Sequence, residues 1–479
     1  MKENLKKISP VIWEIPKETR NDMRTNARIY VSEDMLPQLF RDRSIEQLIN
    51  VTTLPGIEGN AVVMPDMHEG YGFPIGGVAA TNLDDGVISP GGIGYDINCG
   101  IRLLKTDYHF KEISNKIEQL SKEIYKTVPS GVGKGGKFKF DDKELDKVLE
   151  KGCIWAKEKG YANGDDLKFI ESNGSLSSAE SSAVSKYAKD RGRDQLGTLG
   201  SGNHFIEIDI IQNILDKEAA EVYGLFEGQI VIQIHTGSRG LGHQVASDYI
   251  KTMISAVKKY GIVIPDKELS CVPISSPEGK SYFAAMSASA NYAWANRQLI
   301  TYEVREAMES VFGKYNSKLN ILYDVAHNIA KIEDHQIGNT TKKVMVHRKG
   351  ATRAFPANHP EIPFEYKTVG QPVLIPGSMG TASYVLVGLE GGMENSFGST
   401  CHGSGRLLSR TAALKKINGN QLFNELNNRG IKIQTASMKG LAEEAPDAYK
   451  DVESVVGVVD TAGIAKKVVK LKPLAVIKG

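Results

Sequence analysis

The chain has 479 residues, and its 59 Lys and Arg are almost balanced by 57 Asp and Glu, which leaves a formal net charge of +2. This balance excludes a globally basic protein, so a nucleic-acid partner would have to be bound by a local basic groove. Four cysteines in so long a chain do not indicate a disulfide framework, and no apolar stretch approaches the ~20 residues that span a bilayer. We therefore expect a cytoplasmic protein that does not enter a membrane.

Hydrophobic periodicity predicts helices and strands along the whole chain. Helical spacing of apolar residues predicts helices over residues 20–38, 111–126, 141–159, 179–191, 241–259, 282–312 and 406–416. Short apolar or alternating runs predict strands over residues 61–64, 76–81, 86–89, 343–346, 371–389 and 474–477. Pro65 is expected to stop the first of these strands.

This pattern predicts an α+β fold in which mixed or antiparallel sheets pack at the centre, helices lie outside, and the active site lies at strand ends. Regular alternation of strands and helices is missing, and so is a dinucleotide fingerprint, which argues against a doubly wound fold. The candidate site residues described below are spread from Asp66 to Lys478 and must converge. We therefore expect residues 1–479 to form one integrated catalytic domain.

Residues 91–100 form the most informative stretch, because Asp96 and Cys99 stand three positions apart in a glycine-dense segment. Glycine lets the backbone fold tightly enough to bring the carboxylate and the thiol together, which makes half of a metal site. The remaining ligands would be His204, His235 and His327. Each of them lies where a strand-like run meets a glycine or polar turn, and such turns deliver active-site residues.

A fourth histidine, His402, lies in a run of small residues before the predicted helix 406–416, whose N-terminus would suit a phosphate. Any one histidine of this kind is more often a hydrogen-bonded structural residue, and a lone cysteine such as Cys99 is more often a small buried apolar residue. The shared local contexts of the histidines favour a functional cluster. Spacing alone leaves both a metal hydrolase and a nucleotidyl-transfer enzyme open.

From about residue 60 to the last residue, the chain resembles the RtcB family of RNA-splicing ligases. The motifs that carry the resemblance are residues 65–70, 91–100, 197–205, 234–240, 326–328, 376–380 and 402–406. In that family, a GTP- and manganese-dependent enzyme joins an RNA 2′,3′-cyclic phosphate or 3′-phosphate end to a 5′-hydroxyl end. The resemblance implies a histidine–GMP intermediate and an activated RNA–ppG end.

The resemblance also implies a role for each candidate residue. His402 would be the catalytic nucleophile, and Asp66 would orient it, although an Asp after a proline can equally be a turn residue. Two Mn²⁺ ions would share Cys99, with His204 and His235 on one ion and Asp96 and His327 on the other. Thiolate and imidazole ligands taken alone favour zinc, so manganese is implied by the resemblance only.

The expected substrate contacts form two sets. GTP would contact Asn203, His204, Phe205, Glu207, His327, Asn328, Pro376, Gly377, Ser378, Met379, Ser383, His402, Gly403, Ser404, Gly405, Tyr449 and Lys478, with Lys478 and Glu207 on the guanine. RNA phosphates would contact Arg191, Arg193, Arg353 and Arg410, since guanidinium groups pair well with phosphate. The alternative for these arginines is a solvated turn or helix end.

The expected partners are RNA, as tRNA halves in splicing or as broken RNA in repair, and the small protein archease, with which the family often works. One rival hypothesis is a metal-dependent phosphoesterase or cyclic phosphodiesterase acting on RNA ends, with His402 as a mere phosphate binder. The other is a non-catalytic RNA-binding protein with a structural metal. Structural metal sites are closed shells, and the glycine-flanked ligands here argue against one.

Overall fold

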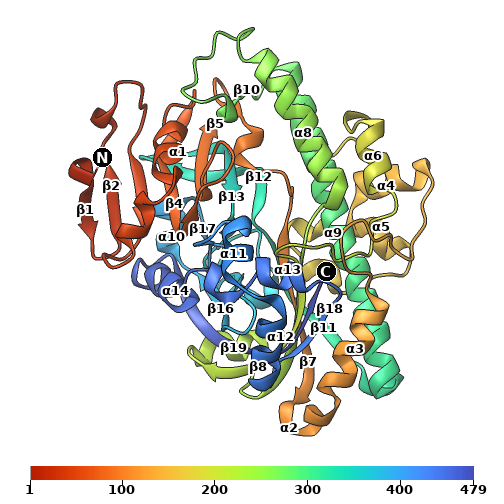
Figure 1. Cartoon of the computed structure of the whole chain (residues 1–479). Helices are drawn as coiled ribbons and strands as arrows, with labels where there is room; N and C mark the ends of the chain where they lie inside the picture. Colours follow the sequence, from red (N-terminus) through yellow and green to blue (C-terminus); the bar gives the residue numbers. More distant parts are fainter. Residues whose placement is uncertain (1) are drawn as a thin grey trace.

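Two large β-sheets organise the computed structural model, which describes residues 2–479 (Figure 1). Within these residues, the first sheet has seven strands in the order β1-β2-β3-β4-β5-β13-β12. Its strands are β1 (Lys6–Ser9), β2 (Ile12–Ile15), β3 (Ala27–Tyr30), β4 (Ile57–His68), β5 (Ile75–Asn82), β12 (Asn328–Ile337) and β13 (Thr340–Lys349). Strands β3 and β4 are parallel and the other neighbours antiparallel, so this sheet is mixed.

The second sheet follows the order β11-β7-β9-β8-β19-β16-β15, and β18 pairs with β19 at its side. Its strands are β7 (Gly100–His109), β8 (Phe205–Ile214), β9 (Gln229–Thr236), β11 (Leu319–Ala326), β15 (Pro372–Ile375), β16 (Ser383–Gly388), β18 (Lys432–Thr435) and β19 (Ala465–Lys478). Two small pairs complete the strands: β6 (Val87–Ile88) with β10 (Val272–Pro273), and β14 (Ala351–Arg353) with β17 (Ser399–Cys401).

The register of the second sheet brings distant parts of the chain to one edge. Gly100 at the start of β7 pairs with Thr236 at the end of β9 and with Ala326 at the end of β11. Phe205 at the start of β8 pairs with Lys478 at the end of β19. Because these pairs are antiparallel, starts and ends of neighbouring strands coincide. Four candidate metal ligands border these strands and therefore meet at this edge with the penultimate residue, Lys478: they are Cys99, His204, His235 and His327.

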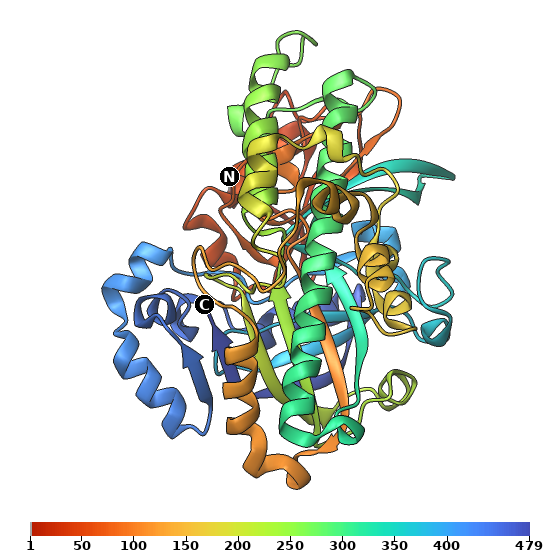
Figure 2. The same ribbon diagram turned by 90° about the vertical axis from the view of Figure 1, so that its right-hand side faces the viewer.

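Helices cover the outside of the sheets (Figures 1 and 2). They are α1 (Ser44–Val51), α2 (Phe110–Ile113), α3 (Ile117–Thr127), α4 (Asp142–Lys151), α5 (Cys153–Glu158), α6 (Lys186–Gly192), α7 (Lys217–Tyr223), α8 (Arg239–Ala256), α9 (Pro277–Phe312), α10 (Glu390–Ser396), α11 (Arg410–Lys416), α12 (Gly419–Asn428), α13 (Met438–Glu443) and α14 (Val452–Thr461). Figure 2 shows the long helix α9 running along one face of the second sheet. Its start is capped by Ser276, whose hydroxyl accepts from the Gly279 N–H at 3.0 Å.

Burial of apolar side chains holds the helices against the sheets. Ile117, Leu120 and Ile124 lie on the buried face of α3 and belong to one core cluster with α9 and the second sheet. Their spacing puts them on a single helical stripe, and each such burial contributes about 1.5–3 kcal/mol. A second cluster joins the first sheet to α1 and α14. The site edge therefore stands on a closely packed scaffold.

The α+β class is confirmed, and so are the helices predicted over 241–259 and 282–312, but three helix predictions are wrong. Residues 20–38 contain strand β3 and the start of a 3₁₀ helix at Leu36, because pairing with β2 and β4 buries the apolar positions of the strand. The predicted helix 141–159 is broken at Gly152, whose φ of 54° leaves the helical region. In 179–191, the α-helix starts only at Lys186.

Two boundaries near the site also differ from the prediction. Strand β4 continues through Pro65 to His68, so Asp66 lies within the strand. Helix α11 begins at Arg410 after the cap Ser409, so His402 follows strand β17 and does not lie at a helix N-terminus. No helix among residues 2–479 combines the length and apolarity that crossing a bilayer requires. The four cysteines are buried free thiols.

Candidate functional site

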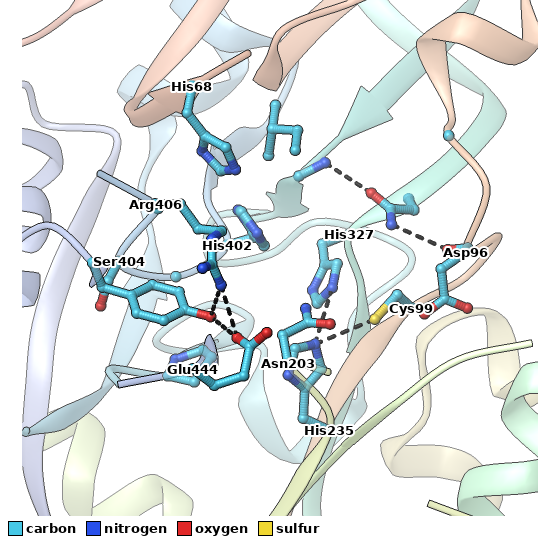
Figure 3. Close-up of a pocket in the computed structure, with 18 of the residues that line it drawn as sticks. His68, Asp96, Cys99, Asn203, His235, His327, His402, Ser404, Arg406 and Glu444 are labelled. Carbon is cyan, nitrogen blue, oxygen red and sulfur yellow. Dashed lines mark hydrogen bonds and ion pairs between the residues drawn. The ribbon is translucent and has the colours of Figure 1, made fainter. Parts of the chain in front are cut away.

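A cavity of about 400 Å³ lies at the edge of the second sheet where β7 and β8 begin and β9, β11 and β19 end. The first sheet contributes the opposite wall (Figure 3). The residues expected to contact GTP line it, with two exceptions. His204 lies behind the wall in contact with Asp96, and Ser383 accepts a hydrogen bond from the Gly377 N–H at 3.0 Å. Ser383 therefore shapes the lining turn from behind.

Asp96, Cys99 and His204 form the first group that could hold a metal ion. The Nδ1–H of His204 donates to the Leu199 carbonyl oxygen at 3.0 Å, which leaves a lone pair on Nε2 when the ring is neutral. That Nε2 lies 2.8 Å from Asp96 Oδ2 and 3.6 Å from the Cys99 Sγ. A lone pair beside a carboxylate requires a positive charge between them, either a proton or a metal ion.

Cys99, His235 and His327 form the second group. The Cys99 Sγ lies 3.2 Å from Nε2 of His235, and that nitrogen lies 3.4 Å from Nε2 of His327. Burial lowers the pKa of both imidazoles well below the usual value, so both rings are neutral near pH 7. Their ring nitrogens therefore keep lone pairs that can bind a metal ion.

The donor set fits two metal ions that share one thiolate. Burial and the charge of Asp96 raise the pKa of the Cys99 thiol, and a bound cation would offset both effects. The resemblance implies a different division of the same five residues, with His204 and His235 on one ion and Asp96 and His327 on the other. His204 Nε2 contacts Asp96 Oδ2, and the His235 ring is adjacent to both other imidazoles, with centroids 5.6 Å from His204 and 5.2 Å from His327.

A buried arginine fixes the backbone that carries these ligands. Arg297 on α9 donates to the carbonyl oxygens of Asn98 at 2.8 Å and Thr236 at 2.9 Å, which flank Cys99 and His235. Its guanidinium also forms a bidentate pair with Asp324, with both distances at 2.8 Å. Burial opposes ionisation, yet Arg297 and Arg102 hold the pKa of Asp324 below its usual range. Sequence reasoning missed this clamp, because no local motif marks it.

Asp66 and His402 are in contact, as the orienting role that the resemblance implies for Asp66 requires. Asp66 Oδ2 lies 2.6 Å from His402 Nδ1 and also accepts from the backbone N–H groups of His402 and Gly403. Despite complete burial, the contacts with His402 hold the pKa of Asp66 below its usual value. A carboxylate at Nδ1 leaves Nε2 as the nitrogen with a free lone pair. In Figure 3, the His402 ring lies between His68 and His327.

The wall that carries the chain end is strongly charged. Lys478 donates to the Gly202 carbonyl oxygen at 2.7 Å, and burial lowers the pKa of this lysine to about 8. Burial and the neighbouring Asp209 raise the pKa of Glu207 well above its usual value. Glu444 is buried beside them and accepts from Arg406 at 2.9 Å. The wall thus offers donors and acceptors to a polar ring.

The four arginines predicted to bind RNA differ in their exposure and in their partners. Arg353 is completely buried, pairs with Glu361 at 2.6 Å and donates to Gln371 at 2.9 Å, so the prediction that it contacts RNA is wrong. Arg353 has a structural role, because a basic side chain can point into the protein where carboxylates such as Glu361 neutralise its charge. The guanidinium of Arg193 forms ion pairs with Asp142 and Asp190.

The other two predicted arginines are accessible. Arg191 is exposed on α6, where it donates to Gln244 at 2.8 Å. The Arg410 side chain is 54% exposed at the cavity wall and pairs with Glu444 at 3.1 Å.

Several lining residues were not predicted from the sequence. They are Gly70, Tyr71, Ile75, Ile93, Gly94, Tyr95, Lys349, Gly350, Arg406, Glu444 and His68. His68 and Arg406 belong to the recognisable motifs 65–70 and 402–406, so these motifs could have indicated them. Glu444 follows no local signal, because only helix packing brings it to the cavity.

Comparisons with known proteins give a consistent result. A family model described as "tRNA-splicing ligase RtcB" matches residues 47–479. Proteins named tRNA-splicing ligase RtcB are similar to this chain over 99% of its length and 99% of theirs, with 54% identity in Thermococcus kodakarensis and 51% in Archaeoglobus fulgidus. A protein of the same name from Methanococcus maripaludis is 50% identical over the full length of both chains.

Proposed function

Because the chain belongs to the RtcB family of tRNA-splicing ligases and is therefore an RNA ligase, we propose the details of its reaction. It joins an RNA 2′,3′-cyclic phosphate or 3′-phosphate end to a 5′-hydroxyl end and consumes GTP. The observation that carries this proposal is the contact of Asp66 with His402 Nδ1, in a cavity that also presents the two metal-binding groups.

His402 acts as the nucleophile in the first step. Asp66 accepts the Nδ1–H, so the Nε2 lone pair can attack the α-phosphorus of GTP. A nitrogen–phosphorus bond forms and pyrophosphate leaves. The guanylate then passes to the RNA 3′-phosphate, which restores His402 and gives RNA–ppG. Attack by the 5′-hydroxyl of the other RNA end forms the phosphodiester and releases GMP, and a cyclic phosphate is first opened by hydrolysis.

Five residues would hold two divalent ions, with Cys99 shared between the two groups. Asp96 and His204 complete one group, and His235 and His327 complete the other. Bound Mn²⁺ would supply charge stabilisation to the phosphates. The family resemblance favours manganese, whereas the softness of the donors favours zinc. Turnover of apo-protein reconstituted with each ion separates the two, and activity with zinc alone contradicts manganese.

The cavity wall with the chain end is the proposed guanine site. An ammonium at Lys478 suits the O6 and N7 acceptors of guanine, whereas adenine presents an amino donor at the equivalent position. Glu207 lines the same cavity and can accept from guanine N1 and N2 when ionised. The turn at Gly377 and Ser378 and the run from Gly403 to Gly405 line the space between this wall and His402.

RNA and protein partners form the remaining part of the proposal. Arg191 and Arg410 are exposed and are proposed to bind RNA phosphates, with Arg410 at the cavity wall and Arg191 on α6. The substrates are tRNA halves or broken RNA with the matching ends, and archease is the proposed protein partner. We infer that residues 1–479 work as one integrated domain, since both sheets contribute residues to one cavity.

Labelling by GTP tests the proposal. After incubation with Mn²⁺ and GTP labelled at the α-phosphate, the protein should carry an acid-labile, alkali-stable label. His402→Ala should abolish it, whereas the control His109→Ala, at the start of α2 and outside the cavity, should retain it. An unlabelled native protein that removes phosphate from RNA ends would instead favour the phosphoesterase or cyclic phosphodiesterase.

A further inference from the structure

We propose that Tyr71, Tyr95 and His243 form a stacking surface for the base of the terminal nucleotide of an RNA end. We call these three residues the aromatic row. The inference rests on the RNA ligase function and adds a binding site for the nucleobase, which the arginines do not provide. It begins from an arrangement of rings that the reaction described above does not use.

The three rings follow one another, with Tyr71 and Tyr95 at the cavity wall and His243 beyond it. The ring centroids of Tyr71 and Tyr95 are 5.6 Å apart with an interplanar angle of 60°. The rings of Tyr95 and His243 are stacked, with centroids 4.9 Å apart and an angle of 25°. Tyr71 follows strand β4, Tyr95 precedes β7, and His243 lies on α8. Three separate segments therefore contribute to one row.

The row leads from the cavity to the surface. Tyr71 and Tyr95 line the cavity and are partly exposed, whereas His243 is exposed. Among residues 2–479, neither phenol hydroxyl in the row has a hydrogen-bond partner within the protein. Two buried tyrosines are bonded, since Tyr223 donates to Gly370 at 2.9 Å and Tyr366 donates to Leu322 at 3.0 Å, whereas the buried hydroxyl of Tyr282 has no partner among the described residues. Because two of its rings line the cavity and all three are at least partly exposed, the row resembles a binding surface more than a core.

The position of the row suits the end of an RNA chain. Tyr95 directly precedes Asp96 of the first metal-binding group, and Gly94 before it has a φ of 95° that a residue with a side chain rarely adopts. A base stacked on the row would therefore place its sugar and phosphate beside that group. The guanine wall with Lys478 is contributed by β8 and β19, so the row does not compete with it.

The charge around the row also fits RNA. Burial and the positive charge of Arg191 lower the pKa of the His243 imidazole, so the ring stacks in its neutral form. Arg191 stands beside it and can take a phosphate of the same strand. Alternation of aromatic rings with a cation is the arrangement by which proteins bind single-stranded nucleic acid without reading its sequence. The row would therefore accept any base.

Binding of RNA without GTP tests the row directly. The native holoenzyme and Tyr95→Ala are titrated against short labelled RNAs with a 5′-hydroxyl or a 3′-phosphate, each with the terminal base present or replaced by an abasic ribose. For one of the two RNA ends, the 5′-hydroxyl or the 3′-phosphate, Tyr95→Ala should weaken binding of the RNA that keeps its terminal base by about fivefold to a hundredfold. It should leave the matching abasic RNA unchanged, because that RNA has no base to stack.

Equal weakening of intact and abasic RNA, or no weakening at either end, overturns the proposal. Tyr95→Phe should bind like the native protein, since it keeps the ring. Tyr315→Ala is the matched control, because Tyr315 is 97% exposed and lies outside the cavity. If Tyr95→Ala unfolds, the exposed His243→Ala is judged by the same comparison. Labelling of His402 by GTP is scored separately, so failure of the ligation chemistry and failure of the row remain distinct.

Discussion

Asp66 Oδ2 lies 2.6 Å from His402 Nδ1, and the backbone N–H groups of His402 and Gly403 donate to the same oxygen. One carboxylate oxygen thus fixes both the ring and the backbone of the proposed nucleophile. This contact joins strand β4 of the first sheet to the end of β17. His402 is therefore positioned by a residue 336 positions earlier in the chain.

Asp66→Asn should slow labelling of His402 about ten- to a hundredfold, because an amide no longer fixes the tautomer with Nε2 free. The measurement is a single-turnover time course with labelled GTP. Asp34→Asn, at an exposed aspartate, is the matched control. Labelling of Asp66→Asn at the native rate would show that the carboxylate serves only the fold.

The Cys99 thiolate should be required for both metal ions. We expect native protein to bind two Mn²⁺, Cys99→Ser to lose high affinity for both, and His204→Ala to retain one, because His204 belongs to the first group alone. Metal content after gel filtration measures this. Two tightly bound ions in Cys99→Ser would contradict the shared ligand.

GTP affinity should depend on pH through Lys478. Burial lowers its pKa from the ordinary 10.5 to about 8, so the ammonium is lost as pH rises through 8. The KM for GTP should then rise about tenfold between pH 7 and pH 9 and the preference over ATP should narrow. Lys478→Met should show a raised KM at every pH, and the step near pH 8 should be absent. If Lys478→Met shows a change in KM of equal size near pH 8, the pH dependence belongs to another titrating group.

The same shift has a defined effect on stability. Between about pH 8 and 10, the unfolded chain binds the proton that folded Lys478 has lost. The free energy of unfolding contributed by this group therefore rises with pH in that window. Denaturant titrations of native protein and Lys478→Met at pH 8 and pH 10 measure how much more the free energy of unfolding rises with pH in the native protein. This extra rise should be absent if Lys478 keeps its ordinary pKa.

Arg353→Met should lower the free energy of unfolding by about 3–5 kcal/mol, because it removes the cation beside the buried Glu171 and the partner of Glu361. Urea unfolding measures it. Lys122→Met is the matched control, since Lys122 and Glu118 form an exposed pair worth less than about 1 kcal/mol. Equal losses in the two variants would contradict a buried structural role for Arg353.

Arg191→Ala and Arg410→Ala should weaken RNA binding in a salt-dependent way. Each lost phosphate contact should reduce the slope of log K against log salt by about 0.7 for single-stranded RNA. Titrations at several salt concentrations check this, with Arg43→Ala, an exposed arginine outside the cavity, as the control. An unchanged slope would show that the arginine in question does not contact an RNA phosphate.

Local patterns in the sequence were sufficient to indicate much of this protein. The glycine-dense segment around Asp96 and Cys99 predicts a paired carboxylate and thiol, because glycine readily adopts the positive φ angles that many tight turns use. Apolar periodicity predicts α8 and α9, since a helix must bury one face in any fold. The strand-end positions of His204, His235 and His327 follow from the same local signals.

Only the tertiary structure decided which of these groups meet. Strand pairing places His204 against Asp96 and His235 against His327, and no spacing along the chain encodes that choice. Burial turns Arg353 inward to Glu361, although its sequence resembles an exposed basic turn. The aromatic row likewise needs three segments packed together. The physical reason is that contacts between distant segments depend on sheet register and side-chain packing, which a local pattern does not contain.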